Sequence, residues 1–437
     1  MAYLKWENSF SEKERDRRWQ LIREFIQNKG MDALLVLGAG VAHQAIGLSQ
    51  VETGRGVQMQ TVDRYLSGWA SRCTVVFPLK GEPVLLGVPQ PVVLRWTPET
   101  PKEELPWIED VRVSVQVENI VAVLKEKGLE RRRVGVWISR SGAGGSRGSA
   151  AGYAARDQVA KGLPDCNFED VGDDLHELMA VKGEEELVLF RRCSESLEQA
   201  TIAIMKVVRP GATELDVHMA IIRTLYEHGA VPSEPYIASG PATTAPGGRL
   251  WGFGVGSPRV LEPGDVVNTG CTFAYIGGIE AQAQLTVAIP PVSSENAECA
   301  RLARECYDEG LRTLRPGIPF KEVAEAMAAP LDSAGAWPMF PQIHSMNPNY
   351  FIGLGSEAAE RRKAEYYKEY YERFHLATGG GHMKGEVVLK PGVVFQFEPD
   401  ACLGRHRVNV GGNVIVTENG NEPLNEVGTR MRIAGEA

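Results

Sequence analysis

Paired cysteines and long apolar runs are both missing from this chain. Its seven cysteines are odd in number, scattered and never arranged as CxxC, which argues against a disulfide framework and a structural zinc site. No apolar run approaches the ~20 residues that cross a bilayer. Residues 1–30 are charged and lack the apolar centre of a secretory signal. We therefore expect reduced thiols, no membrane partner and a cytoplasmic location.

Basic patches and phosphate-binding loops are equally scarce. The formal net charge is -9, and residues 131–133 form only a short basic run, so nucleic acid is not an expected partner. Gly38 and Gly40 follow an apolar stretch, but the third glycine of a dinucleotide fingerprint is absent. The Gly/Ser-rich residues 139–148 lack the Lys-Ser/Thr ending of a phosphate loop. A nucleotide cofactor is therefore not expected.

The chain has instead an ordinary globular composition and the length of two domains. It contains 437 residues, of which 43% are hydrophobic and 24% charged. Residues 1–172 alternate predicted strands and helices, as a small α/β domain does. Residues 173–437 separate helices from antiparallel hairpins, which indicates an α+β domain.

Helical and strand patterns in the second domain follow each other in blocks. A long amphipathic helical tract is predicted from about residue 174 to 208, and Gly211 lies in the turn before the next helix. A β-rich region at 235–290, helices at 295–330 and further strands at 375–434 follow. Residues 356–373, rich in Glu, Arg, Lys and Tyr, read as an inserted surface helix.

One segment near the C-terminus combines flexible backbone with acid/base side chains. Three consecutive glycines, residues 379–381, precede His382 and allow backbone conformations that a side chain would forbid. An apolar strand then leads to Glu398, which stands directly before Pro399. An imidazole and a carboxylate at the ends of ordered elements are candidates for proton transfer or metal ligation.

Several short motifs together resemble those of the pita-bread family of creatinase, prolidase, aminopeptidase P and methionine aminopeptidase. Their shared order over most of the chain carries the resemblance, since each motif alone is weak. They are Tyr65-Leu-Ser-Gly-Trp69, Val181-Lys182, residues 209–214, 237–241 and 262–268, Gly381-His382-x-x-Gly385 and Phe397-Glu398-Pro399. The resemblance implies an α/β N-terminal domain (1–172) and an α+β pita-bread catalytic domain (173–437).

The family's metal ligands are only partly present here. The resemblance implies two Asp, one His and two Glu around two divalent cations, because hard cations need oxygen ligands and negative charge. The first Asp position is Asn268, the second falls in residues 279–282, where Glu280 is the only carboxylate, and the last Glu position is Gly411. We expect no metal cofactor, with a single weakly held divalent cation left open.

Creatinase, the family's metal-free member, is therefore the favoured model. We predict a metal-independent hydrolase or lyase that cleaves a C–N or similar C–heteroatom bond of a small polar, zwitterionic or cationic substrate. His382 is predicted to act as general acid/base, and Glu398 and Glu280 to bind positive charge or move protons. The segment in which creatinase carries its base has no histidine here, so creatine itself is not the expected substrate.

Four further residues are candidates for binding substrate: Arg72, Arg64, Asn268 and His406. The two arginines lie in the N-terminal domain, which in this family reaches the partner subunit's site and so implies a homodimer. Each has a plain structural alternative, such as a surface ion pair or a strand-end amide. Two other functions stay open: an Xaa-Pro metallopeptidase, and a non-catalytic binding protein on the same scaffold.

Overall fold

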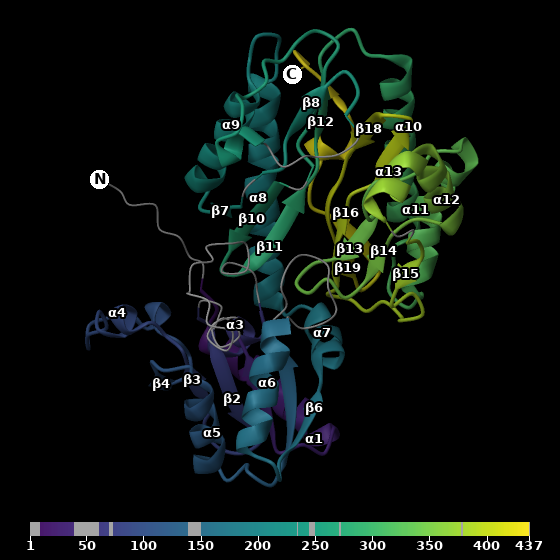
Figure 1. The fold of residues 1–437 in the computed structure, drawn as a ribbon. Coiled ribbons are helices and arrows are strands. Elements are labelled where there is room, and N and C mark those ends of the chain that lie inside the picture. The colour runs from purple at the N-terminus through teal and green to yellow at the C-terminus, as the bar shows by residue number, and fades with distance from the viewer. Residues whose placement is uncertain are drawn as a thin grey trace. The chain divides into compact units, whose positions relative to one another are not determined.

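The computed structural model describes residues 9–38, 61–69, 73–138, 150–233, 235–243, 250–270, 272–376 and 379–436. The chain divides into two compact units, one ending at Met179 and the other running from Ala180 onward. Figure 1 shows the elements of each unit. Within the described ranges, no helix is long and apolar enough to cross a membrane.

A mixed sheet in the order β4-β3-β2-β1-β5-β6 forms the centre of the N-terminal unit. β1 pairs parallel with β5 and antiparallel with β2. The strands are β1 (Ala33–Leu37), β2 (Thr74–Pro78), β3 (Val84–Leu86), β4 (Asp110–Arg112), β5 (Arg133–Ile138) and β6 (Asn167–Asp170). The helices are α1 (Glu12–Asn28), α3 (Val62–Ser67), α4 (Gln90–Val93), α5 (Val117–Glu126), α6 (Ala150–Gly162) and α7 (Gly172–Ala180).

Alternate residues of β1 face two different hydrophobic cores. Leu34 and Val36 join the core built with α1, α3 and α7. Leu35 and Leu37 join the core built with α5 and α6. Because successive side chains of a strand point to opposite faces, the sheet lies between two helical layers. The predicted α/β architecture of this unit follows.

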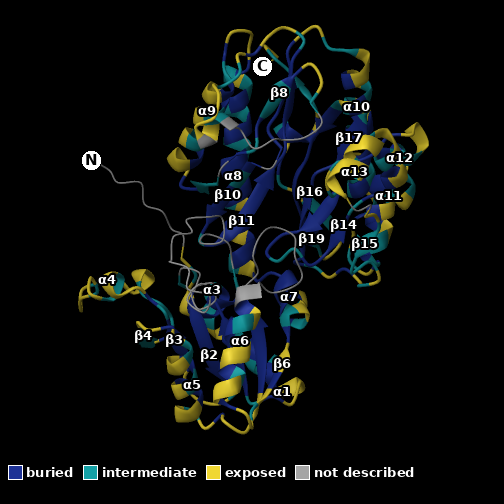
Figure 2. Cartoon of the chain, viewed as in Figure 1, coloured by how far each residue is buried: buried dark blue, intermediate teal, exposed yellow. Residues whose placement is uncertain are grey.

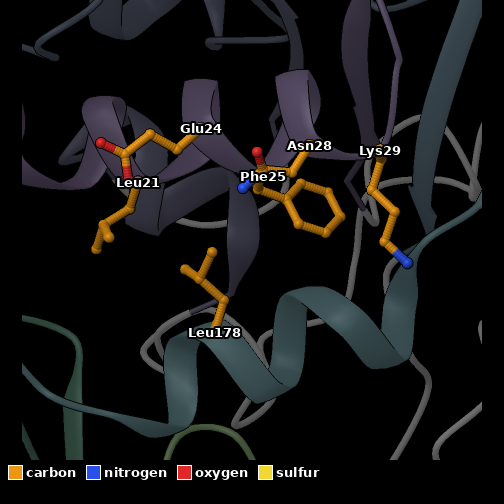
Figure 3. A pocket seen from close by; sticks show the side chains of 6 residues that line it. All are labelled: Leu21, Glu24, Phe25, Asn28, Lys29 and Leu178. Atoms are coloured by element: carbon orange, nitrogen blue, oxygen red, sulfur yellow. The ribbon is translucent and has the colours of Figure 1, made fainter.

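A small hollow on the N-terminal unit lies between α1 and α7, as Figure 3 shows. Its volume is about 270 Å³, and Phe25 and Leu178 form part of its lining. The cation beside it, Lys29, is already paired with Asp174 at 2.9 Å. We assign no chemistry to this hollow.

The predicted helical tract from 174 to 208 is two helices in the structure. α7 ends at Ala180, and α8 (Glu184–Val207) begins after Gly183. The Glu186 carboxylate accepts the Gly183 N–H at 2.9 Å, which caps the new helix. Leu175 and Met179 of α7 pack in a core of the N-terminal unit, so the unit boundary lies after α7 rather than at residue 172.

The second unit contains several sheets, antiparallel except where β12 pairs parallel with β21, and the helices that cover them. Its sheets have the orders β11-β10-β7, β21-β12-β9-β8 and β15-β14-β13-β16-β19-β20, with β17 and β18 as a separate hairpin. The helices after α8 are α9 (Glu214–Glu227), α10 (Ser294–Thr313), α11 (Phe320–Ala334), α12 (Glu357–Tyr366) and α13 (Lys368–Phe374). α12 and α13 occupy the predicted surface insertion.

The strands of this unit are short and largely buried, as Figure 2 shows for β11 and β16. Those before α10 are β7 (Val231–Pro232), β8 (Ala238–Gly240), β9 (Val266–Asn268), β10 (Thr272–Ile276), β11 (Ile279–Ala283) and β12 (Thr286–Ala288). Those after α11 are β13 (Ile343–Ser345), β14 (Ile352–Gly353), β15 (His382–Met383), β16 (Val394–Phe397), β17 (Asp400–Leu403), β18 (His406–Asn409), β19 (Gly412–Thr417), β20 (Gly420–Pro423) and β21 (Arg432–Ile433). The predicted combination of an α/β domain with an α+β domain is confirmed.

Candidate functional site

The carboxyl group of Glu398 lies at the centre of the candidate site. It follows the last residue of β16, whose Phe395 and Phe397 point into the core of the unit. Because strand side chains alternate, Glu398 emerges on the face opposite that core. Only 5% of Glu398 is exposed. A carboxyl group this buried needs hydrogen-bonding partners to be tolerated.

Two glutamine amides supply partners for Glu398. The Nε2 groups of Gln282 and Gln284 each donate to Glu398 Oε2 at 2.8 Å. The two glutamines are separated by one residue at the end of β11, so both side chains lie on the same face. A backbone bridge between Gln284 and Gly411 holds this end of β11 close to Glu398.

A tight hairpin turn fixes the register that brings these glutamines to Glu398. β10 and β11 pair antiparallel up to Ile276 and Ile279, which leaves Gly277 and Gly278 as the turn. Both glycines have positive φ, 58° and 90°. A two-residue hairpin turn of this kind requires that conformation, which side chains disfavour. A shift of one residue would turn Gln282 to the other face of the strand.

His344 is the histidine beside Glu398. It lies in β13, which pairs antiparallel with β16. Its Nε2 atom is 3.4 Å from Glu398 Oε1. Its Nδ1–H donates to the carbonyl oxygen of Ser345 at 3.1 Å. Since a carbonyl oxygen only accepts, Nδ1 carries the proton and the Nε2 lone pair faces Glu398.

Burial moves the protonation equilibria of this pair toward the neutral forms. It raises the pKa of Glu398 to about 8, with the nearby Asp400 charge adding to the effect. Burial lowers the pKa of His344, while the negative charge of Glu280 partly opposes that shift. Near neutral pH, Glu398 therefore holds its proton and His344 is uncharged.

A fully buried ion pair lies directly behind Glu398. Arg407 Nε is 3.3 Å from Asp400 Oδ1. Asp400 also accepts the backbone N–H groups of Met339 at 2.6 Å and Phe340 at 3.2 Å. These bonds hold the Asp400 charge in place. After burial, that charge is the next cause that raises the pKa of Glu398, while the charge of Arg407 opposes it.

Asn268 is buried in a group of amide side chains. Its Oδ1 accepts the Gly270 N–H at 2.9 Å, and its Nδ2 donates to Thr286 Oγ1 at 3.3 Å. A methyl group built on Gly270 would lie 2.8 Å from Asn409 Oδ1 and 3.0 Å from Asn268 Oδ1. Asn409 in turn donates to the Glu398 carbonyl oxygen at 2.9 Å. Asn268 thus bonds to the local backbone, which matches the strand-end amide named above as the alternative to a substrate-binding role.

Glu280 lies in β11 with Gln282, just before Gln284, and is also 5% exposed. Its carbonyl oxygen accepts Asn347 Nδ2 at 3.0 Å. Its charge acts on His344. The structure therefore brings Glu280 and Glu398 to the same histidine, which is His344.

His382 is not brought to Glu398. It lies in the edge strand β15, separated from β16 by β14 and β13. Burial lowers its pKa, and the charge that opposes this shift comes from Glu325. The pairing predicted between His382 and Glu398 is therefore replaced by that between His344 and Glu398. The strand order β15-β14-β13-β16 places His344, and not His382, beside β16. The sequence motif around His382 contains no information about this order.

The remaining predicted binding residues are His406 and the two arginines of the N-terminal domain. His406 Nδ1 lies 3.0 Å from Asn296 Oδ1 of α10. Arg64 belongs to α3 of the N-terminal unit, where burial lowers its pKa to about 10. Arg72 lies outside the described residues. Their predicted roles stay predictions.

The sequence did not point to His344, Gln284 or Asn409. It included Gln282 only within residues 279–282, the segment of the second Asp position. The alternation of Glu280, Gln282 and Gln284 was a usable signal, since one strand face then carries three polar side chains. His344 had no such signal. It lies in a strand of three residues that follows a loop containing Pro338 and Pro341.

The donor set at this site does not fit a pair of divalent cations. Among the described residues, no group of three or more His, Cys, Asp or Glu side chains could hold a metal ion. Glu398 Oε2 faces two N–H donors, whereas a cation would need acceptors around it. The Gly411 position has no room for a carboxylate side chain, because a Cβ there would lie 1.9 Å from Phe397 O.

A family model described as metallopeptidase family M24 matches residues 188–418, more than half of the chain. The Xaa-Pro dipeptidase of Pyrococcus furiosus is 22% identical over 262 residues, covering 59% of this chain and 66% of that protein. The creatinase of Bacillus sp. (strain B-0618) is 22% identical over 283 residues, covering 62% of each chain. The matched stretch thus spans slightly less than two thirds of these relatives.

The fold itself has close structural counterparts. The crystal structure of X-Pro aminopeptidase from Thermotoga maritima MSB8 superimposes with a TM-score of 0.67 at 18% identity. It covers 95% of this chain and 99% of that one. At this identity the likeness shows the two-domain pita-bread fold.

Proposed function

Because the chain belongs to metallopeptidase family M24, a family of hydrolases, we propose that it is a metal-independent hydrolase of a small polar substrate. The bond cleaved is a C–N or similar C–heteroatom bond. The acid/base pair is Glu398 and His344. The observation that carries this proposal is the buried Glu398 carboxyl group, held by two amide donors and 3.4 Å from His344 Nε2.

The pair supplies one acid and one base at the same pH. Neutral His344 offers the Nε2 lone pair, because its Nδ1–H is engaged by Ser345. Glu398, with a pKa of about 8, offers a proton near neutral pH. Two titratable groups whose environments separate their roles in this way are typical of hydrolytic sites.

The proposed reaction balances its protons within the pair. As a water oxygen bonds to the substrate carbon, the water's proton passes to His344 Nε2. As the C–N bond breaks, the Glu398 proton passes to the leaving nitrogen. A proton then returns from His344 to Glu398 and restores the starting state. A lyase would use the same pair without the attacking water.

Unused acceptors indicate which substrates suit the site. Gln282 Oε1 and Asn347 Oδ1 are buried and accept no hydrogen bond within the described residues. Buried acceptors without donors are costly. Together with the Glu280 carboxylate they favour a substrate that brings N–H donors or positive charge. This supports a cationic or zwitterionic compound.

An Xaa-Pro metallopeptidase is the second candidate, since relatives of this chain bear that name. It would need divalent cations at the site, and the amide-rich donor set argues against them. A non-catalytic binding protein is the third candidate. It would retain ligand binding when Glu398 and His344 are changed conservatively.

The decisive experiment combines metal analysis with matched histidine variants. Purified protein is assayed on a panel of guanidino, ureido and amino-acid amides and on Xaa-Pro dipeptides, with and without a chelator. We expect turnover of a non-peptide compound that survives chelation. His344→Ala and Glu398→Gln should each lower kcat by about 10²–10⁴-fold. His382→Ala, at a histidine outside the pair, is the control and should retain activity.

The outcomes separate the candidates. Stoichiometric Mn, Co, Zn or Fe that is lost together with peptidase activity would establish the metallopeptidase. Binding without turnover of any compound in the panel would favour the non-catalytic protein. For the proposed enzyme, the activity should fall on both sides of neutrality, below the lowered pKa of His344 and above about pH 8, the pKa of Glu398.

We further propose, on the family resemblance, a cytoplasmic homodimer in which Arg64 and Arg72 bind a substrate carboxylate in the partner's site. Mixing an Arg72→Gln variant with a His344→Ala variant tests this arrangement. Mixed dimers should recover part of the activity that each variant lacks. No recovery after subunit exchange, with exchange verified separately, would contradict a shared site.

A further inference from the structure

A groove on the second unit is lined by three arginines and does not include Glu398 or His344 in its lining. Its volume is about 510 Å³. Arg304 contributes from α10, and Arg430 and Arg432 contribute from the C-terminal segment. We propose that this arginine groove binds a small dianion carrying a phosphate group. The proposal is independent of the function proposed above.

Arg304 forms a fixed wall of the groove. Its Nε and Nη2 bond to Asp308 at 3.0 and 2.6 Å, and its Nη1 donates to Thr429 Oγ1 at 2.9 Å. The guanidinium is thereby satisfied and oriented. Arg304 therefore contributes shape more than charge or new hydrogen bonds, because Asp308 pairs its guanidinium group.

Arg430 and Arg432 have guanidinium N–H groups that donate to no acceptor within the described residues. Arg432 donates only its Nε–H, to Val427 O at 2.8 Å, and its two Nη groups have no acceptor within the described residues. Arg430 is exposed and has no side-chain acceptor in that part of the chain. Two guanidinium groups in one groove thus have N–H donors that can pair with the oxygens of an anion.

The nearby carboxylates do not neutralise these two arginines. Glu198 is engaged by the backbone N–H groups of Glu426 at 3.1 Å and Val427 at 2.7 Å. Glu426, Glu198 and Glu436 all act electrostatically on Arg432, yet no ion pair joins any of them to it among the described residues. Burial and the neighbouring charge of Arg430 lower the pKa of Arg432. A bound dianion would relieve this like-charge repulsion.

The lining favours a phosphate group, alone or as a monoester. A phosphate carries about -1.5 to -2 charges near pH 7, which suits several guanidinium groups at once. Leu311 and Pro423 add an apolar side to the groove, which could accommodate the organic part of a monoester. Free phosphate and a monoester share the same recognising chemistry, and the experiment distinguishes them.

The floor of the groove adjoins the backbone around the acid/base pair. Gly411 N–H donates to Gly428 O at 2.8 Å, and Asn413 N–H donates to Asn425 Oδ1 at 3.0 Å. Gly411 in turn bridges to Gln284, which bonds to Glu398. An anion that orders the segment around Arg430 is therefore connected to the Glu398 site through two backbone contacts.

Calorimetric titration of the full chain tests the groove. Inorganic phosphate and phenyl phosphate are titrated at constant ionic strength into wild type and into the double variant Arg430→Gln/Arg432→Gln. Arg315→Gln, at an exposed arginine that forms no ion pair within the described ranges, is the control. We expect the double variant to bind at least about tenfold more weakly and the control to match wild type.

Three comparisons complete the design. Arg432→Lys keeps the charge and loses the fork, so an intermediate affinity supports recognition by the guanidinium geometry. Tighter binding of phenyl phosphate than of inorganic phosphate identifies a monoester as the ligand, and equal affinity identifies free phosphate. Unchanged affinity in a folded double variant, or no binding of either phosphate by wild type, would overturn the proposal.

Discussion

Burial of Glu398 raises its pKa to about 8, and this shift makes the stability of the fold depend on pH. The folded chain binds the Glu398 proton up to a pKa of about 8, whereas the unfolded chain releases it near the ordinary value of 4.5. Between these pH values the folded state binds more protons than the unfolded state, so the free energy of unfolding falls as the pH rises. This contribution is complete below about pH 4.5 and lost above about pH 8.

Glu398→Gln should remove this slope. The amide keeps the shape of the side chain and can still accept from Gln282 and Gln284. We expect the variant to gain stability relative to wild type as the pH rises from about 6.5 to 8.5, by on the order of a few kcal/mol. Urea unfolding at several pH values measures it. Working above the ordinary His344 pKa of 6.5 avoids the opposite slope of that histidine.

A constant stability difference across that range would show that Glu398 titrates normally. His382→Gln serves as the comparison, because the charge that acts on His382 comes from Glu325 and not from Glu398. That variant should follow the wild-type slope above pH 6.5.

The site residues were predictable to different degrees for physical reasons. Glu398 follows a continuous apolar strand before a proline, and Glu280 alternates with two glutamines, so both were visible in the sequence. The partner of Glu398 was not visible. His344 reaches it only through the pairing of β13 with β16 across the 48 intervening residues 346–393, which include α12 and α13.

At the scale of elements, the loop after β13 connects the histidine to β11. Asn347 has a φ of 44°, and its Nδ2 donates to the Glu280 carbonyl oxygen at 3.0 Å. The buried Lys182 ammonium donates to the Asn347 carbonyl oxygen. Asparagine tolerates the left-handed conformation better than other side-chain-bearing residues. The loop thus depends on Asn347 for both its shape and its attachment.

Asn347→Ala should destabilise the chain by about 1–3 kcal/mol, since it loses the bond to Glu280 and keeps the strained φ. Asn347→Gly loses the same bond but relaxes the backbone, so it should be the more stable variant of the two. Chemical unfolding of both variants measures the difference. Equal stabilities would mean that the left-handed conformation is not maintained.

The β10–β11 hairpin gives a second test at this scale. Gly278 has a φ of 90°, so Gly278→Ala should cost about 1 kcal/mol or more and disturb the positions of Gln282 and Gln284. Gly420→Ala is the control, because an added Cβ there meets nothing within 4 Å and φ is not in the left-handed range. Thermal unfolding should separate the two, and a neutral Gly278→Ala would contradict the turn.

Element prediction succeeded for single elements and failed at a short break inside a long helical tract. The apolar stretch before Gly38 is the buried strand β1, while the tract at 174–208 hid a break at Gly183. That break depends on where α7 packs, since Leu175 and Met179 join the N-terminal core. Tertiary packing of this kind leaves little trace in local periodicity.

At the scale of the whole molecule, the proposal predicts that metal ions leave stability unchanged. A ligand that binds the folded state raises the free energy of unfolding by RT ln(1 + [L]/Kd), about 2.7 kcal/mol at a hundredfold excess over Kd. A chain that holds two catalytic cations should therefore lose several degrees of Tm on chelation. We expect no change in Tm with chelator, and none with added Mn²⁺, Co²⁺ or Zn²⁺ at concentrations that saturate metallopeptidases.

The structural reason lies at Glu398 and Gly411. The carboxyl group that would anchor a cation already accepts two amide N–H groups, and Gly411 cannot accept a longer side chain. The double variant Gln282→Asp/Gln284→Glu is the positive counterpart, since it replaces both donors with acceptors. It should acquire a metal-dependent rise in Tm that wild type lacks. A metal-dependent rise in wild type itself would restore the metallopeptidase as the better account of this chain.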